Sequence, residues 1–150
     1  MKKSVLKSTV FPLILLMILG SFSQAYANRS KALFEKANKK YNSKEYAIAA
    51  SLYTKLIKDP NLSKQDKLTA YINGAACYYY NHDYKNALKW YALAIQHGAK
   101  EPIYYYKLAE CLKMNGRYIE AIAKFEEYQK MVPDDPNTAV MIEGCKLAIE

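Results

Sequence analysis

The sequence contains few of the residues and motifs that enzymes and metal sites use. Its 150 residues include three cysteines and two histidines, and no cysteines form a C-x-x-C pair, so neither their number nor their spacing fits a zinc site. The sequence also has no glycine-rich phosphate-binding loop, no H-E-x-x-H motif and no G-x-S-x-G motif. We therefore expect a protein that is not an enzyme, with no catalytic residues, no metal and no cofactor.

The sequence lacks an apolar run long enough to cross a membrane. Its main apolar run, from Val10 to Leu19, follows three lysines and precedes the triplet Ala25-Tyr26-Ala27. A membrane-spanning helix needs roughly 20 apolar residues, whereas a basic start, a short apolar run and a small-x-small site are typical of a signal peptide. We predict a signal peptide over residues 1–27, with an uncleaved membrane anchor as the alternative.

The predicted cleavage site also lacks a nearby cysteine that could accept a lipid. We therefore expect no membrane span after cleavage. The expected location is the periplasm, with or without association with the outer membrane.

Charge of one sign is only in modest excess. Residues 28–150 carry 19 basic and 14 acidic side chains, which are scattered along the chain and form no basic block. Such a pattern is typical of a solvated helical surface. Because there is neither a basic stripe nor a nucleic-acid-binding motif, we expect no nucleic-acid partner.

Internal repetition is the strongest positive signal in the sequence. Three anchor tyrosines lie 38 and then 34 residues apart: Tyr46, Tyr84 and Tyr118. Nine residues before each anchor, and again three residues after it, there is an alanine: Ala37, Ala75 and Ala109, then Ala49, Ala87 and Ala121. Seven residues after each anchor there is an aromatic residue: Tyr53, Tyr91 and Phe125. Small residues let two helices approach closely, and the aromatic residue fills the space between helical hairpins.

These repeats predict an all-α chain. The expected helices cover residues 30–42, 46–58, 64–81, 84–97, 102–115, 118–131 and 136–150. Pro102 and Pro136 suit the first turn of a helix, and Asp135 is placed to cap the last one. No segment shows the period-two alternation of a strand.

The chain resembles the tetratricopeptide-repeat (TPR) family over nearly all of residues 30–150. The alanines match positions 8 and 20 of the 34-residue TPR frame, and the aromatic residues match position 24. Departures are Leu56 and Tyr128 at position 27, and Lys44 and His82 where a turn glycine is usual. The resemblance implies a TPR solenoid of three helix-turn-helix repeats over residues 28–134, plus a C-terminal helix.

That final segment, residues 135–150, continues the frame, because Pro136 lies 34 residues after Pro102. Glu143 replaces the small residue that would receive a second helix. The segment is therefore interpreted as a capping helix or as the first helix of a fourth repeat.

The TPR resemblance also indicates a binding surface. In TPR proteins a concave groove is lined by first-helix positions 2, 5, 6, 9, 12 and 13. From these positions we select a predicted partner-binding set: Asn38, Tyr41, Asn73, Tyr79, Tyr80, Tyr106, Lys107 and Lys113. The convex face and the edges are the alternative locations.

One specialised TPR site is not expected here. Asn38, Asn73 and Lys107 resemble part of the clamp that some TPR domains close on a C-terminal carboxylate. Phe34 and Ile103 replace two of its three cations, so most of the charge that holds a carboxylate is missing.

The three cysteines share one frame position, because Cys77, Cys111 and Cys145 are spaced by 34 residues. Equivalent points on stacked repeats lie roughly 8–10 Å apart, beyond the roughly 7 Å that a disulfide tolerates. We expect three buried, unpaired cysteines. An enzyme that uses these cysteines for redox or hydrolytic chemistry is a rival hypothesis.

More loosely, the chain resembles the N-terminal region of exported envelope proteins that join TPRs to a β-propeller and an OmpA-like domain. The PorE-type component of the type IX secretion system belongs to this group. The likeness is carried by the signal peptide, the three repeats, and the segment 132–136 followed by Gly144-Cys145. We therefore expect an exported scaffold that binds an envelope protein or peptide. The alternative is the N-terminal structural segment of a larger peptidoglycan-anchored protein.

Overall fold

The chain folds into a row of helices. The computed structural model describes Gln24 and residues 28–150, so the predicted signal peptide lies outside the described residues except for Gln24. Residues 28–42 are helical. They are followed by α2 (Tyr46–Leu56), α3 (Lys64–Tyr80), α4 (Tyr84–Gln96), α5 (Pro102–Met114), α6 (Tyr118–Met131) and α7 (Pro136–Leu147). The predicted all-α fold is confirmed, with helix ends that differ from the predicted ones by at most three residues.

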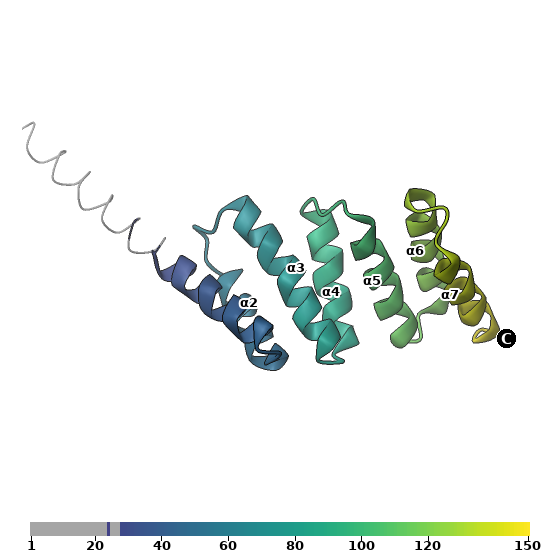
Figure 1. Cartoon of the computed structure of the whole chain (residues 1–150), viewed down its shortest axis with the longest axis horizontal. Coiled ribbons are helices and arrows are strands. Elements are labelled where there is room, and N and C mark those ends of the chain that lie inside the picture. The colour runs from purple at the N-terminus through teal and green to yellow at the C-terminus, as the bar shows by residue number, and fades with distance from the viewer. Residues whose placement is uncertain (1–23, 25–27) are drawn as a thin grey trace, which may run out of the picture.

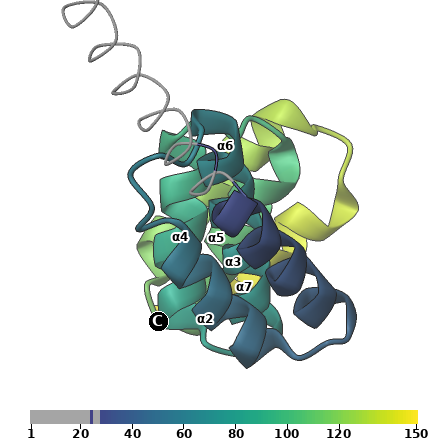
Figure 2. The same cartoon turned by 90° about the vertical axis from the view of Figure 1, so that its left-hand side faces the viewer.

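The helices follow one another along the long axis of the molecule in chain order (Figure 1). From α2 onward, each helix packs against the next one along the chain. Residues 28–42 contact α2 through Phe34 and Asn38, which both meet Tyr53. Helix α3 pairs with α4 and α5 with α6, while α7 packs on α6. Figure 2 shows the same stack from its N-terminal end.

Side chains near the helix starts fix where several helices begin. Ser63 accepts a hydrogen bond from the amide of Asp66, and Asp83 accepts one from the amide of Asn86. At α7, Asp135 accepts from the amide of Asn137, and Pro136 occupies the first turn. These contacts satisfy amides that have no partner within the helix, and the last one confirms the predicted cap.

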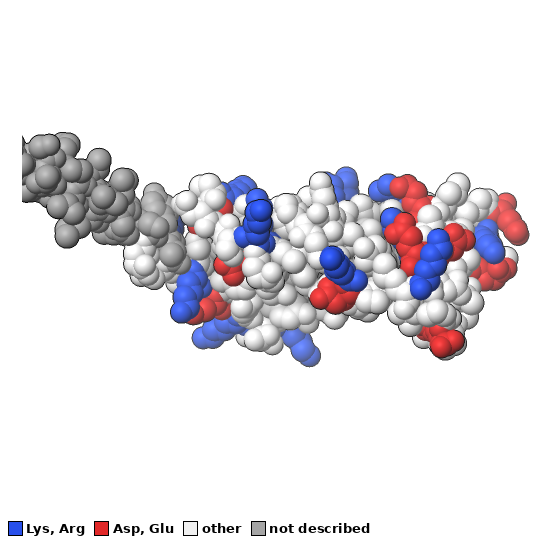
Figure 3. All heavy atoms as spheres, turned by 90° about the horizontal axis from the view of Figure 1, so that it is seen from above, with Lys and Arg blue, Asp and Glu red and all other residues white. Residues whose placement is uncertain are grey.

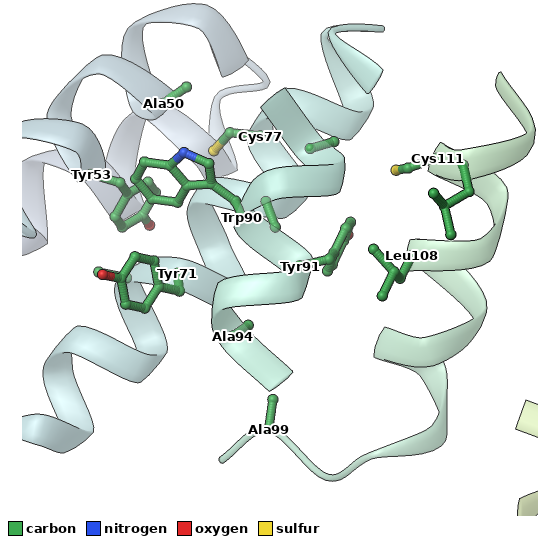
Figure 4. Close-up of a cluster of buried hydrophobic side chains, with 14 of the residues drawn as sticks. Ala50, Tyr53, Tyr71, Cys77, Trp90, Tyr91, Ala94, Ala99, Leu108 and Cys111 are labelled. Carbon is green, nitrogen blue, oxygen red and sulfur yellow. The ribbon is translucent and has the colours of Figure 1, made fainter. Parts of the chain in front are cut away.

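The predicted frame residues form the core. The six frame alanines are fully buried, as are Tyr53 and Phe125, and Tyr91 is nearly so. Figure 4 shows how α4 uses two neighbouring residues: Trp90 points toward Tyr71 on one side, and Tyr91 points toward Leu108 on the other. A single helix thereby packs against the helices on both sides of it.

Three equivalent turns adopt the left-handed backbone conformation. Lys44 has φ 59°, His82 has φ 60° and Gly116 has φ 72°. Glycine adopts this conformation without steric cost, whereas other residues are strained in it. The first two turns therefore have the backbone geometry of a glycine turn, although Lys44 and His82 stand where glycine is usual.

The three cysteines are unpaired and fully buried, as predicted. Burial raises the pKa of the Cys77 thiol and of the Cys111 thiol to about 12. Thiols held in the protonated form are poor nucleophiles. The thiol environment therefore gives no support to the rival enzyme hypothesis.

Charge is distributed unevenly in the folded chain. Residues 28–67 carry ten basic and four acidic side chains, whereas residues 68–150 carry nine basic and ten acidic ones. On the face drawn in Figure 3, acidic side chains gather toward the C-terminal end. None of the described helices is long and apolar enough to cross a membrane.

Candidate functional site

The first helices of the repeats form one continuous surface. Asn73 on α3 donates a hydrogen bond to Asn38, which belongs to the helix over residues 28–42. Farther along, Lys107 on α5 donates to Tyr79 on α3, and Lys113 on α5 contacts Met141 on α7. We call this face, at the groove positions predicted from the TPR frame, the first-helix surface.

At its N-terminal end the first-helix surface holds a closed amide network. The Tyr53 hydroxyl donates to Asn38 Oδ1, and Asn73 Nδ2 lies 3.4 Å from both Asn38 Oδ1 and the Tyr53 hydroxyl. Burial raises the pKa of Tyr53 to about 12, so the hydroxyl keeps the proton that it donates. The predicted residues Asn38 and Asn73 are thus brought together, but they are already engaged with each other.

The middle of the surface holds a charged triad. Lys107 Nζ lies 2.7 Å from Glu110 Oε2 and 3.2 Å from the Tyr79 hydroxyl, which itself donates to Glu110 over 3.1 Å. The ammonium group also lies 4.3 Å from the centre of the Tyr79 ring, within cation–π range. Burial lowers the pKa of Lys107, but the hydrogen bonds to Glu110 and Tyr79 outweigh it, so the net pKa is raised. Lys107 is therefore charged and neutralised within the protein.

These two networks bear on the carboxylate clamp. Asn38 and Asn73 hydrogen-bond to each other, and Lys107 is paired with Glu110. The Lys107 charge that a clamp would direct at a ligand carboxylate is therefore already paired within the protein.

Tyrosines form an array across the first two repeats. Tyr46 stacks on Tyr80 with ring centres 5.1 Å apart, and Tyr41 meets Tyr46 edge-on at 5.7 Å. Tyr79 continues the array, with ring centres 5.6 Å from Tyr80 and 5.7 Å from Tyr84. The predicted residues Tyr41, Tyr79 and Tyr80 therefore lie in one cluster of rings. Tyr46 and Tyr84, named above only as anchors of the repeat, also belong to this array and were not in the predicted binding set.

The two remaining predicted residues, Tyr106 and Lys113, lie on α5. Tyr106 is partly buried, with its ring centre 5.4 Å from that of Phe125 and 5.0 Å from that of Tyr128. Lys113 is also partly buried and reaches toward α7. Tyr106 therefore contributes mainly packing, whereas Lys113 extends the surface toward the last helix.

Large apolar residues are exposed along the same surface. They stand at groove positions of the TPR frame, and their exposed fractions are 48% for Tyr80, 48% for Ile103, 57% for Met114, 68% for Val140 and 62% for Leu147. Only Tyr80 was in the predicted set. Val140 and Leu147 could have been found by extending the groove positions into residues 135–150, where the frame continues.

The sequence as a whole identifies the family. The profile of the Iml2/Tetratricopeptide repeat protein 39 family matches residues 13–150. The chain belongs to this family. The predicted TPR assignment is thereby confirmed, and with it a fold that serves as a scaffold for protein interactions.

One characterised relative shares this TPR region. The protein-lysine N-methyltransferase SMYD4 of Pongo abelii is 31% identical over 108 residues, which make up 70% of this chain and 13% of the relative. The chain therefore spans about an eighth of that protein's length. The methyltransferase activity in the relative's name belongs to SMYD4 as a whole.

Solved TPR structures share the fold. The type III secretion chaperone SycD of Yersinia enterocolitica, bound to a peptide of the translocator YopD, has a TM-score of 0.63 at 22% identity, covering 82% of this chain and 96% of SycD. The C-terminal TPR-containing domain of an FK506-binding protein of Plasmodium falciparum has a TM-score of 0.69 at 16% identity. The match covers 85% of this chain and 92% of that domain. YrrB, a TPR protein with an unusual peptide-binding site, has a TM-score of 0.64 at 17% identity. The match covers 82% of this chain and 65% of YrrB. At these identities the likeness establishes the fold alone.

Two cavities lie away from the tyrosine array, at the N-terminal end of this TPR stack. One, of about 590 Å³, is lined by Phe34, Leu62 and several acidic side chains. The other, of about 570 Å³, has the apolar residues Leu33 and Leu56 between four cations: Arg29, Lys36, Lys55 and Lys58. Within the array the Tyr80 ring is about half exposed, and an exposed aromatic surface suits an extended or helical protein segment.

No group of three or more histidine, cysteine, aspartate or glutamate side chains in residues 28–150 is placed to hold a metal ion.

Proposed function

We propose that this protein is an exported TPR scaffold that binds another cell-envelope protein, or a peptide segment of one, through its first-helix surface. One observation carries the proposal: exposed tyrosine and large apolar side chains follow the first helices from α3 to α7. Rigid aromatic rings and exposed apolar side chains at the centre of a surface are the usual anchors of protein interfaces.

The fold neighbours support this reading by analogy. SycD is described in complex with a translocator peptide, and YrrB is described as having a peptide-binding site. Both are statements about those proteins. For this chain they make a protein or peptide ligand the first class to test.

The test uses two matched triple variants. The first removes exposed side chains from the first-helix surface: Tyr80→Ala, Ile103→Ala and Met114→Ala. The second removes exposed side chains from the second helices: Ile48→Ala, Ile119→Ala and Met131→Ala. All six side chains are at least 44% exposed, so neither variant opens a cavity in the core.

The tagged full-length protein and each triple variant are cross-linked in cells of the natural host and purified from the cell envelope. We expect a specific partner to be lost by at least about tenfold from the first variant, corresponding to about 1.4 kcal/mol of binding free energy, and to be retained by the second. Loss from the second variant alone would move the interface to the second helices and contradict the proposal.

Periplasmic location, with or without outer-membrane association, rests on the basic and apolar pattern of residues 1–27. Cell fractionation tests it, together with N-terminal sequencing of the native protein. We expect the protein in the periplasmic or outer-membrane fraction, starting at Asn28. A protein that stays in the cytosol with residues 1–27 attached would contradict export.

A second candidate is the N-terminal structural segment of a larger, peptidoglycan-anchored OmpA-like secretion protein. The exposure of Ile149, just after α7, favours it, because a further helix would cover such a residue. An immunoblot of the natural host tests it. A native product well above 17.2 kDa would favour this candidate, and a product of that mass or smaller would count against it.

A further inference from the structure

Lys113 is a cation of the first-helix surface that the described residues do not neutralise. Lys107 is paired with Glu110, but Lys113 takes part in none of the salt bridges within residues 28–150. Its ammonium group lies 3.6 Å from the sulfur of Met141, and a thioether is only a weak acceptor. A partly buried ammonium group therefore retains most of its capacity to bind an anion.

Gly144 leaves space next to this ammonium group. A Cβ built on Gly144 would lie 3.7 Å from Lys113 Nζ, with no nearer neighbour. Any larger residue at position 144 would extend its side chain toward the ammonium group. The glycine on α7 thus leaves the charge of Lys113 accessible from the side of the last helix.

Exposed apolar residues belong to the same part of the surface. Met114 adjoins Lys113 on α5, and Val140 and Leu147 lie at groove positions of α7. A ligand that covers these residues removes water from around Lys113. An ion pair is stronger where water is excluded, so apolar contact and charge pairing reinforce each other here.

Building on the proposed function, we infer that the C-terminal half of the first-helix surface binds a peptide segment in which a carboxylate is flanked by large apolar side chains. Lys113 takes the carboxylate, while Met114, Val140 and Leu147 take the apolar side chains. A basic peptide segment would place a second cation against Lys113. An uncharged segment would bury the Lys113 charge without pairing it.

Selection of short random peptides displayed on phage, using the full chain as bait, tests this inference. From the wild type we expect peptides with Asp or Glu next to Leu, Ile, Met or Phe. Lys113→Glu should weaken binding of these peptides by at least about tenfold and shift selection toward Lys or Arg flanked by apolar residues. Lys113→Met should weaken binding without creating a preference for basic peptides.

Lys130→Glu is the matched control, since Lys130 is an exposed lysine near the end of α6. It should change binding by less than about twofold. Circular dichroism checks that each variant keeps its helices, and the reversed preference of Lys113→Glu cannot arise from unfolding.

Three results would overturn the inference. They are selected peptides without acidic enrichment, an unchanged preference in Lys113→Glu, and a selection that yields no peptide above background. None of these results by itself contradicts the proposed function. The proposed function is tested separately, by whether a cellular partner co-purifies with each of the two triple variants.

Discussion

Gly74 shows how closely the two helices of the second repeat approach each other. A Cβ on this residue would lie 2.3 Å from the ring of Trp90, well inside contact distance. Overpacking of this kind costs about 1–3 kcal/mol, whereas replacing a helical glycine with alanine gains at most about 1 kcal/mol. We predict that Gly74→Ala lowers the free energy of unfolding by about 1–2 kcal/mol, measured by urea denaturation.

Gly144→Ala is the control for this prediction. The added methyl group meets nothing closer than the flexible end of Lys113, so the helix-propensity gain should remain and stability should stay equal or rise by up to about 1 kcal/mol. Equal destabilisation by the two substitutions would contradict the close contact at Trp90.

Lys44 is the residue at which the turn geometry and the residue type disagree most clearly. Its φ of 59° is a left-handed conformation, which costs a residue with a Cβ about 1–2 kcal/mol. We predict that Lys44→Gly raises the free energy of unfolding by about 0.5–1 kcal/mol, after the extra entropy of glycine in the unfolded chain is subtracted.

The other two turns provide comparisons for Lys44→Gly. His82→Gly should gain less, because the His82 ring hydrogen-bonds to the Tyr84 hydroxyl at 2.9 Å. Gly116→Ala should lose about 1 kcal/mol. A loss of stability in Lys44→Gly would contradict the strain argument.

Buried thiols make stability depend on alkaline pH. The folded-state pKa of Cys77 and of Cys111 is about 12, raised by burial from an ordinary value of 9.0. A raised folded-state pKa means that the folded chain holds its proton more tightly than the unfolded chain. The stabilisation is complete below pH 9 and is lost as the pH rises from 9 toward 12.

We predict that the urea midpoint falls between pH 9 and pH 10.5 more steeply in the wild type than in a Cys77→Ala, Cys111→Ala variant. The native thiols should also resist iodoacetamide until the chain is unfolded. Rapid alkylation of the folded protein would contradict their burial and revive the enzyme hypothesis.

At the scale of elements, α7 depends on the cap that precedes it. Asp135 accepts hydrogen bonds from the amide of Asn137 and from the Thr138 hydroxyl, and Thr138 is fully buried. The backbone hydrogen bond from Asn137, with further hydrogen bonds, holds the pKa of Asp135 below its ordinary value. The capping contribution is therefore present above pH 3.8 and lost as the pH falls through the lower folded-state pKa.

We predict that Asp135→Ala speeds hydrogen exchange of the α7 amides while leaving α3 and α4 unchanged. At acidic pH the wild type should approach the variant. Uniform acceleration across the chain would show that α7 is not a separately opening element.

The helices themselves could be read from the sequence because their signals are local. Alanine spacing, the anchor tyrosines and the prolines at 102 and 136 depend only on positions along the chain. Which side chains complete the surface depends on contacts between helices that are far apart in sequence. The pairing of Lys107 with Tyr79, and the stacking of Tyr46 on Tyr80, involve residues at least 28 positions apart, and no single-helix pattern reveals such partners.

At the scale of the whole molecule, folding turns a scattered charge pattern into an uneven one. Along the sequence the charges are scattered and form no basic block. In the solenoid, sequence order becomes position along the long axis (Figure 1), so the basic excess of residues 28–67 is confined to one end. Summing charge over each repeat, rather than looking for runs, would have revealed this asymmetry.

The central claim is that a partner binds the first helices and not the second helices. Site-specific photo-cross-linking in intact cells tests it most directly, with a benzophenone amino acid placed at Tyr80 or Ile103 in one pair of variants and at Ile48 or Ile119 in the other. We predict a discrete cross-linked product from Tyr80 and Ile103 and none from Ile48 and Ile119. Products from Ile48 and Ile119 alone would contradict it.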